Sequence, residues 1–101
     1  MTTDTEIKID EKIKQKINEP KLWKVIFLND DFTPIEFVIE LLMKVFKHSQ
    51  ETAKSLTMEI HNNGSAIAGI YSFEIAEVKS VESTSLARSS GFPLQIRMEE
   101  E

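Results

Sequence analysis

Three consecutive polar residues, Asn29, Asp30 and Asp31, are the clearest chemical feature of the sequence, because they follow an apolar run directly. Their side chains carry acceptor oxygens, and an ammonium group offers three N–H donors that such acceptors satisfy. The cluster is therefore a candidate site for a cation or an ammonium group, although a plain polar turn explains the same residues. His61 stands apart, and its ordinary role is that of a packed surface residue or a partner for a helix C-terminus.

Catalysis has little support in the sequence. A metal site built from Asp30, Asp31 and His61 is conceivable, but the chain has no closely spaced His or Cys pair of the kind that metal sites use. No serine stands in a glycine elbow, and the three glycines are isolated, so no phosphate-binding loop is present. We expect no catalytic residue, no metal and no cofactor, and a small metal-dependent enzyme is a remote alternative.

Composition favours a small cytoplasmic protein. The chain has 101 residues, a net charge of -5 and no cysteine, which suits one domain in a reducing compartment. No basic face for nucleic acid is visible. No apolar run is long enough to cross a membrane, and no hydrophobic leader follows Met1. We therefore expect neither nucleic acid nor a membrane among the partners.

Residues 1–20 differ from the remainder of the chain. They are rich in Thr, Asp, Glu, Lys and Gln and contain no aromatic residue. Ile9, Ile13 and Ile17 recur every four residues, but the mixed charge favours a flexible N-terminal extension. Pro20 marks its end, so residues 21–101 form the predicted core domain.

Periodicity and capping signals divide that core into six elements. Strands are predicted over residues 21–28, 65–71 and 94–98, where β-branched residues or alternation dominate. Helices are predicted to follow Thr33, Ser49 and Ser72, each of which can act as an N-cap. The expected fold is α+β, a compact β-α-α-β-α-β domain whose three-stranded antiparallel sheet packs against helices.

Further local signals refine the helices. Pro34 suits the first position of the helix after Thr33, and Glu36 completes a capping box with Thr33. Gly64 or Asn63 suits a left-handed helix end. On the third helix we expect apolar residues to face inward and charged residues to form a solvated face. The inward residues are Ile75, Val78 and Leu86, and the solvated ones include Glu74 and Lys79.

The stretch from Leu28 to Val38, LNDDFTPIEFV, resembles the signature of the ClpS family. The resemblance runs from residue 21 to about residue 98 without gaps. Its further blocks are His61, Gly64, Gly69 to Tyr71, Glu74 to Lys79, Ala87 with Arg88, and Pro93 with Leu94. Together these motifs are highly specific for the family.

This resemblance implies an adaptor that binds proteins whose first residue is Phe, Tyr, Trp or Leu. It hands them to an unfoldase of the ClpA or ClpC type and its ClpP peptidase, in part by offering its N-terminal extension to the unfoldase. The matching positions imply three sets of residues. The residues that hold the α-amino group are Asn29, Asp30, Asp31 and His61. The pocket for the first side chain is lined by Thr33, Ile35, Thr57, Ile60 and Leu94. Glu74 and Lys79 face the N-terminal domain of the unfoldase.

The sequence departs from the family pattern at Ile35 and Thr57, where methionine is frequent. Ile is stiff and β-branched, whereas Met is flexible, so the order of preference among first residues is left open. The alternative from another class is a structural interaction domain, because the C-terminal domain of the ribosomal stalk protein has a similar α+β shape.

Overall fold

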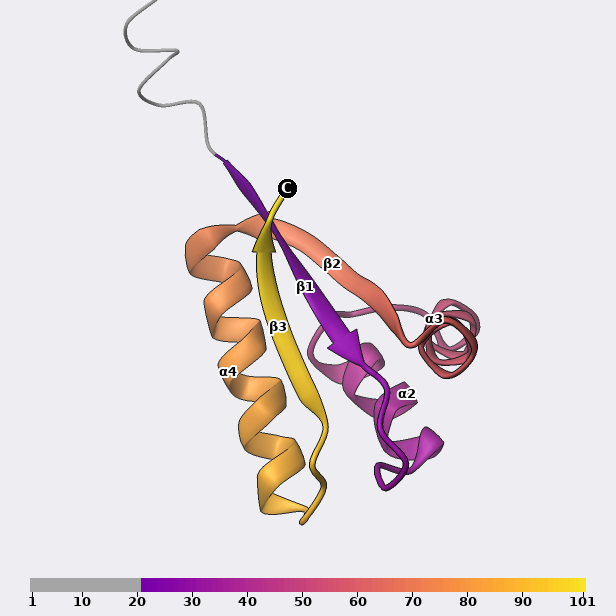
Figure 1. Cartoon of the computed structure of the whole chain (residues 1–101). Coiled ribbons are helices and arrows are strands. Elements are labelled where there is room, and N and C mark those ends of the chain that lie inside the picture. The colour runs from indigo at the N-terminus through magenta and orange to yellow at the C-terminus, as the bar shows by residue number, and fades with distance from the viewer. Residues whose placement is uncertain (1–20) are drawn as a thin grey trace, which may run out of the picture.

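The computed structural model describes residues 21–101, and the predicted flexible extension lies outside the described residues. The described part forms three strands and three helices in the predicted order (Figure 1). The elements are β1 Leu22–Leu28, α2 Ile35–Lys44, α3 Gln50–Asn63, β2 Ser65–Ser72, α4 Phe73–Ser89 and β3 Gln95–Glu100. The predicted α+β class and β-α-α-β-α-β order are therefore confirmed.

β1 is the central strand of an antiparallel sheet with the order β2-β1-β3. The pairing of β1 with β2 shifts by one residue after Val25. Val25 pairs with Gly69 and the next residue, Ile26, pairs with Ile67, so Ala68 has no partner and forms a β-bulge. A Cβ at Gly69 would lie only 2.2 Å from the Tyr71 hydroxyl. The bulge thus needs glycine for space, since the Tyr71 ring lies across the strand at this point.

The hydrophobic core lies on one face of the sheet. Val25 and Phe27 are fully buried there, and the Phe27 ring packs edge-on against Phe46 at 5.4 Å. Ile67 and Ile70 lie on the opposite face and are each 40% exposed, because strand residues alternate between faces. The helices therefore cover one side of the sheet and leave the other open.

The helix ends follow the sequence signals only in part. Ser49 accepts a hydrogen bond from the Thr52 amide at 3.1 Å, and Gly64 has φ +91°, so both predicted ends of α3 are confirmed. The predicted cap at Thr33 is wrong. α2 begins at Ile35, so its N-cap residue is Pro34, and no side-chain hydrogen bond caps the helix. The Thr33 hydroxyl instead donates to a carboxylate in the preceding loop.

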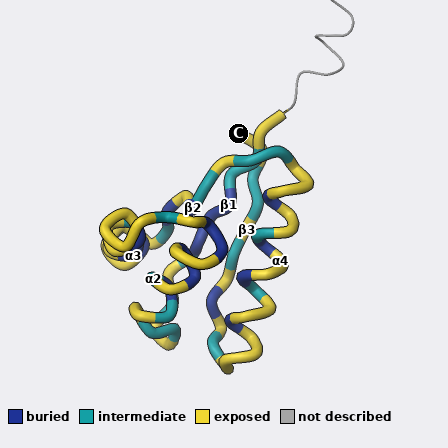
Figure 2. The backbone as a smooth tube through the Cα atoms, turned by 180° about the vertical axis from the view of Figure 1, so that it is seen from behind, coloured by how far each residue is buried: buried dark blue, intermediate teal, exposed yellow. Residues whose placement is uncertain are grey.

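The predicted orientation of α4 is also wrong. Ile75, Val78 and Leu86 are 50%, 63% and 41% exposed rather than turned inward. Figure 2 shows buried and exposed stretches alternating along this helix. Its buried residues are all small, namely Ala76, Ser80, Ser83 and Ala87. β1 brings bulky side chains such as Trp23 and Phe27 to the same face of the sheet, so only small residues let the helix pack closely.

We expect substitutions on the two faces of α4 to differ sharply. Ala87→Leu forces a branched side chain into a fully buried position and should lower the free energy of unfolding by about 1–3 kcal/mol. Val78→Ala is the matched control, and it should stay within about 0.5 kcal/mol of the wild type. Urea denaturation measures both. A loss of about 2 kcal/mol or more for Val78→Ala would contradict this orientation of the helix.

Candidate functional site

The loop between β1 and α2 is organised by the carboxylate of Asp30. Its Oδ1 accepts hydrogen bonds from the amides of Phe32 at 2.8 Å and Thr33 at 2.7 Å, and its Oδ2 accepts one from the Thr33 hydroxyl at 2.8 Å. The amide of Asn29 donates to the Gly64 carbonyl at 2.8 Å, which ties the loop to the end of α3. Both carboxylate oxygens of Asp30 are therefore used within the loop itself.

The same contacts set the ionisation of Asp30. Partial burial raises its pKa, but the hydrogen bonds from Thr33 and Phe32 outweigh that effect, helped by the positive charge of Arg88. The net result is a pKa below the usual value of an aspartate. Asp30 is therefore ionised when the loop has this shape.

A cavity of about 370 Å³ opens between this loop and the facing sides of α2 and α3. Its rim carries the exposed polar residues Asn29, Asp31 and His61, whereas Val38 and Ile60 line it as buried apolar residues. The full lining is Asn29, Asp30, Asp31, Phe32, Thr33, Pro34, Ile35, Val38, Thr57, Ile60 and His61. A ligand with a polar end and an apolar body suits such a cavity.

Thr57 behaves as an apolar wall of this cavity. It is 3% exposed, and its hydroxyl donates to the Ala53 carbonyl one turn earlier at 2.7 Å. The hydroxyl is thus satisfied within α3. Ile35 is the reverse case, because it is apolar but 44% exposed. It therefore stands at the mouth of the cavity.

The structure brings together eight of the residues that the sequence singled out for binding, and it separates one. Leu94 is 1% exposed within the hydrophobic core and is not among the residues that line the cavity. Sequence reasoning missed Phe32, Pro34 and Val38 as lining residues. Val38 follows Ile35 by three positions, which places both on one helix face, so spacing alone could have found it.

The two residues implied for docking have different surroundings. Glu74 is exposed, as expected. The expected solvated position is wrong for Lys79, whose ammonium donates to the Val45 carbonyl at 2.7 Å and lies over the Phe46 and Tyr71 rings at 5.7 and 5.3 Å. Lys79 thus joins α4 to the end of α2, because a carbonyl at a helix C-terminus attracts a cation.

Metal chemistry finds no support within residues 21–101. No group of three or more His, Cys, Asp or Glu side chains in that range is arranged to hold a metal ion. Within the same range, no helix combines the length and the apolar character that crossing a membrane requires.

Comparison with known proteins assigns the family. A family model described as ATP-dependent Clp protease adaptor protein ClpS matches residues 18–97. The chain belongs to the ClpS family. ClpS proteins are protease adaptors and not enzymes, so the family assignment favours the adaptor over the metal-dependent enzyme and the structural interaction domain.

Individual ClpS relatives match most of the chain. The ClpS protein of Campylobacter jejuni (strain 81-176) is 50% identical over 86 residues, which cover 85% of this chain and 90% of the relative. That of Clostridium acetobutylicum is 47% identical over 93 residues, covering 90% and 92%. The structure of Agrobacterium tumefaciens ClpS2 bound to L-phenylalaninamide is 45% identical, with a TM-score of 0.79, and the match covers 81% of this chain and 99% of that one.

The loop contacts predict a pH-dependent stability. Because the pKa of Asp30 is lower in the folded chain, its contribution is present above about pH 3.9, the ordinary aspartate value, and is lost as the pH falls through the folded value. Asp30→Asn should therefore lower the Tm at pH 7, and its difference from the wild type should shrink in acid. Thermal unfolding from pH 7 to pH 2 measures this.

Asp31→Asn is the matched control, since Asp31 makes no side-chain hydrogen bond or salt bridge within residues 21–101. It should leave the Tm at pH 7 nearly unchanged. A constant difference between Asp30→Asn and the wild type at every pH would show that Asp30 does not stabilise the loop through its charge.

Proposed function

We propose that this protein is an adaptor for N-degrons, which binds other proteins by a free α-amino group and a large hydrophobic first side chain. Phe, Tyr, Trp and Leu are the first residues that it accepts. The observation that carries the proposal is one cavity in which a rim of hydrogen-bond acceptors surrounds apolar walls. The two parts of the cavity match the two parts of a first residue.

The rim supplies the partners that an ammonium group needs. A cation that leaves water must find acceptors, and the side chains of Asn29, Asp31 and His61 provide them. Asp30 acts differently, because its oxygens are taken by the loop. Within the acidic pair, Asp31 therefore faces the ammonium group and Asp30 holds the loop around it. Each charge-assisted hydrogen bond contributes about 1.5–3 kcal/mol.

The apolar walls supply the selectivity for the first side chain. Val38 and Ile60 are buried, and Thr57 presents no free hydroxyl donor, so these walls favour an apolar group. Burying a Phe or Leu side chain contributes about 1.5–3 kcal/mol. Ile35 at the mouth is stiff and disfavours β-branched first residues by crowding. Neither half of the cavity is sufficient alone, so binding requires both a free terminus and a large side chain.

The ligand of the Agrobacterium tumefaciens relative supports this chemistry. That protein is bound to L-phenylalaninamide. This small molecule has a free α-amino group, a benzyl side chain and an amide in place of a carboxylate, so it imitates the first residue of a protein. The 45% identity between the two chains supports the proposal that this protein recognises the same chemical group.

Delivery is the second half of the proposal. The family description names an adaptor of an ATP-dependent Clp protease, which supports a partnership with a ClpA- or ClpC-type unfoldase and ClpP in the cytoplasm. The exposed Glu74 offers a contact for the N-terminal domain of the unfoldase. Residues 1–20 are the segment that the unfoldase engages, so that the adaptor releases its substrate.

The decisive experiment compares a peptide that begins with Phe with the same peptide acetylated at its terminus. Acetylation removes the charge and two donors, so affinity should fall at least about tenfold. Fluorescence anisotropy measures both Kd values, and a peptide that begins with Ala controls for the side chain. Equal affinity for the free and acetylated peptides would overturn the proposed recognition.

The docking surface predicts different results for its two charged residues. Glu74→Lys should weaken association with the unfoldase about tenfold and leave both Tm and peptide affinity unchanged. Lys79→Ala should destabilise the fold by about 1–2 kcal/mol, because the Val45 carbonyl and two aromatic rings lose their cation. Pull-down and thermal unfolding measure these effects. Full unfoldase binding by Glu74→Lys would exclude Glu74 from the interface.

A further inference from the structure

We propose that a second cavity, on the far side of the same loop, receives the side chain of the substrate's second residue when that side chain is large and apolar. This inference rests on the proposed function, since it requires that the first residue occupies the cavity described above. It adds a preference at the second position to the recognition of the first.

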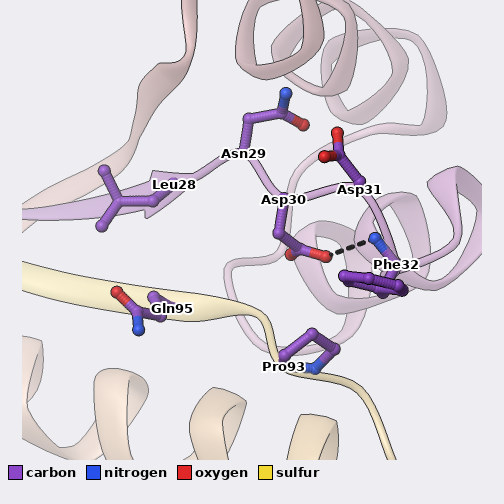
Figure 3. Close-up of a pocket in the computed structure, with 7 residues that line it drawn as sticks. All are labelled: Leu28, Asn29, Asp30, Asp31, Phe32, Pro93 and Gln95. Atoms are coloured by element: carbon purple, nitrogen blue, oxygen red, sulfur yellow. Dashed lines mark hydrogen bonds between the residues drawn. The ribbon is translucent and has the colours of Figure 1, made fainter.

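The second cavity has a volume of about 390 Å³. Figure 3 shows its walls, with Pro93 and Gln95 on one side and Leu28 with the loop residues 29–32 on the other. The same four loop residues also line the first cavity. The loop is therefore a shared wall with a cavity on each side.

Both walls of the second cavity are held in place without a ligand. Asp30 fixes the loop through its three hydrogen bonds. The opposite wall is fixed by Arg88, whose guanidinium donates to the carbonyls of Phe92 at 2.9 Å and Leu94 at 2.7 Å. The Phe92 ring also packs edge-on against Phe37 at 4.9 Å. A preformed cavity of this kind loses little entropy when it is filled.

The geometry of an extended peptide matches this arrangement. Successive side chains of an extended chain point to opposite sides, and their Cα atoms are about 3.8 Å apart. A substrate that places its first side chain in one cavity therefore directs its second side chain away from that cavity. A backbone that crosses the loop turns this second side chain into the cavity on the other side.

Phe32 marks the crossing point. It lines both cavities, and it is 78% exposed, which is unusual for a large aromatic residue in a preformed loop. With Leu28 and Pro93 it gives the second cavity an apolar surface, while the oxygens of Asp30 accept hydrogen bonds from two loop amides and the Thr33 hydroxyl. An apolar second side chain would cover the Phe32 ring, and this coverage is the source of the preference.

The test uses peptides that all begin with Phe and differ only at the second residue, which is Leu, Asn or Gly. The wild type should bind the Leu peptide about fivefold more tightly than the Gly peptide, and Asn, with a shape similar to that of Leu, should bind like Gly. In Phe32→Ala and Pro93→Ala the ratio of Leu to Gly affinity should fall below about twofold. Val81→Ala, which removes exposed apolar surface from α4, should keep the wild-type ratio.

The outcomes separate this inference from the proposed function. If acetylated and free peptides bind equally, the proposed function fails. If only free peptides bind but the second residue has no effect, the second cavity is not a subsite and this inference alone fails. If the Leu preference survives in both Phe32→Ala and Pro93→Ala, another surface reads the second residue, and the inference is again overturned. Phe32→Leu, which keeps apolar surface, should restore part of the ratio and shows that the loop still folds.

Discussion

The hydrogen bonds that the Asp30 carboxylate accepts from its own loop are the interaction on which the binding surface depends. They hold residues 29–33 in one shape, and this shape forms a wall of two cavities. A loop without them would have to be ordered by each substrate, at a cost in affinity. Partial burial opposes the charge on Asp30, but the loop donors outweigh it and keep the carboxylate ionised. The charge of Asp30 thus acts on the protein itself, whereas Asp31 makes no side-chain hydrogen bond or salt bridge within residues 21–101.

The rest of the fold gives that loop a rigid frame. β1 enters it from the centre of the sheet, and the bond from Asn29 to Gly64 fixes it to the end of α3. α3 in turn presents Thr57, Ile60 and His61 at spacings of three and four, so that two walls and one acceptor lie on one helix face. The first cavity therefore combines the polar side chains of the loop with the apolar sides of packed helices.

α4 shows how packing against the sheet distributes side chains over a helix. Small residues face the bulky side chains of β1, and the larger apolar residues are displaced to the opposite, exposed face. The junction of α4 with α2 is a polar contact. Lys79 donates a hydrogen bond to the Val45 carbonyl, and its ammonium lies over two aromatic rings. α4 is thus joined to the core by its small buried residues and to the end of α2 by Lys79.

Features that depend on neighbouring residues could be predicted from the amino-acid sequence. The order of strands and helices, the Ser49 cap, the left-handed end at Gly64 and the polar cluster after β1 are all local patterns, and each was confirmed. The family signature also gave most of the cavity lining before any geometry was known. Three features could be seen only in the folded structure: the buried face of α4, the bond that Lys79 makes across 34 positions and the place of Leu94 in the core. The hydrogen bonds of Asp30 are a fourth, because the adjacent Asp31 is a residue of the same type. These features depend on which side chains pack against a helix and which groups become hydrogen-bond partners in the folded chain. The spacing of residues along the sequence does not specify these neighbours.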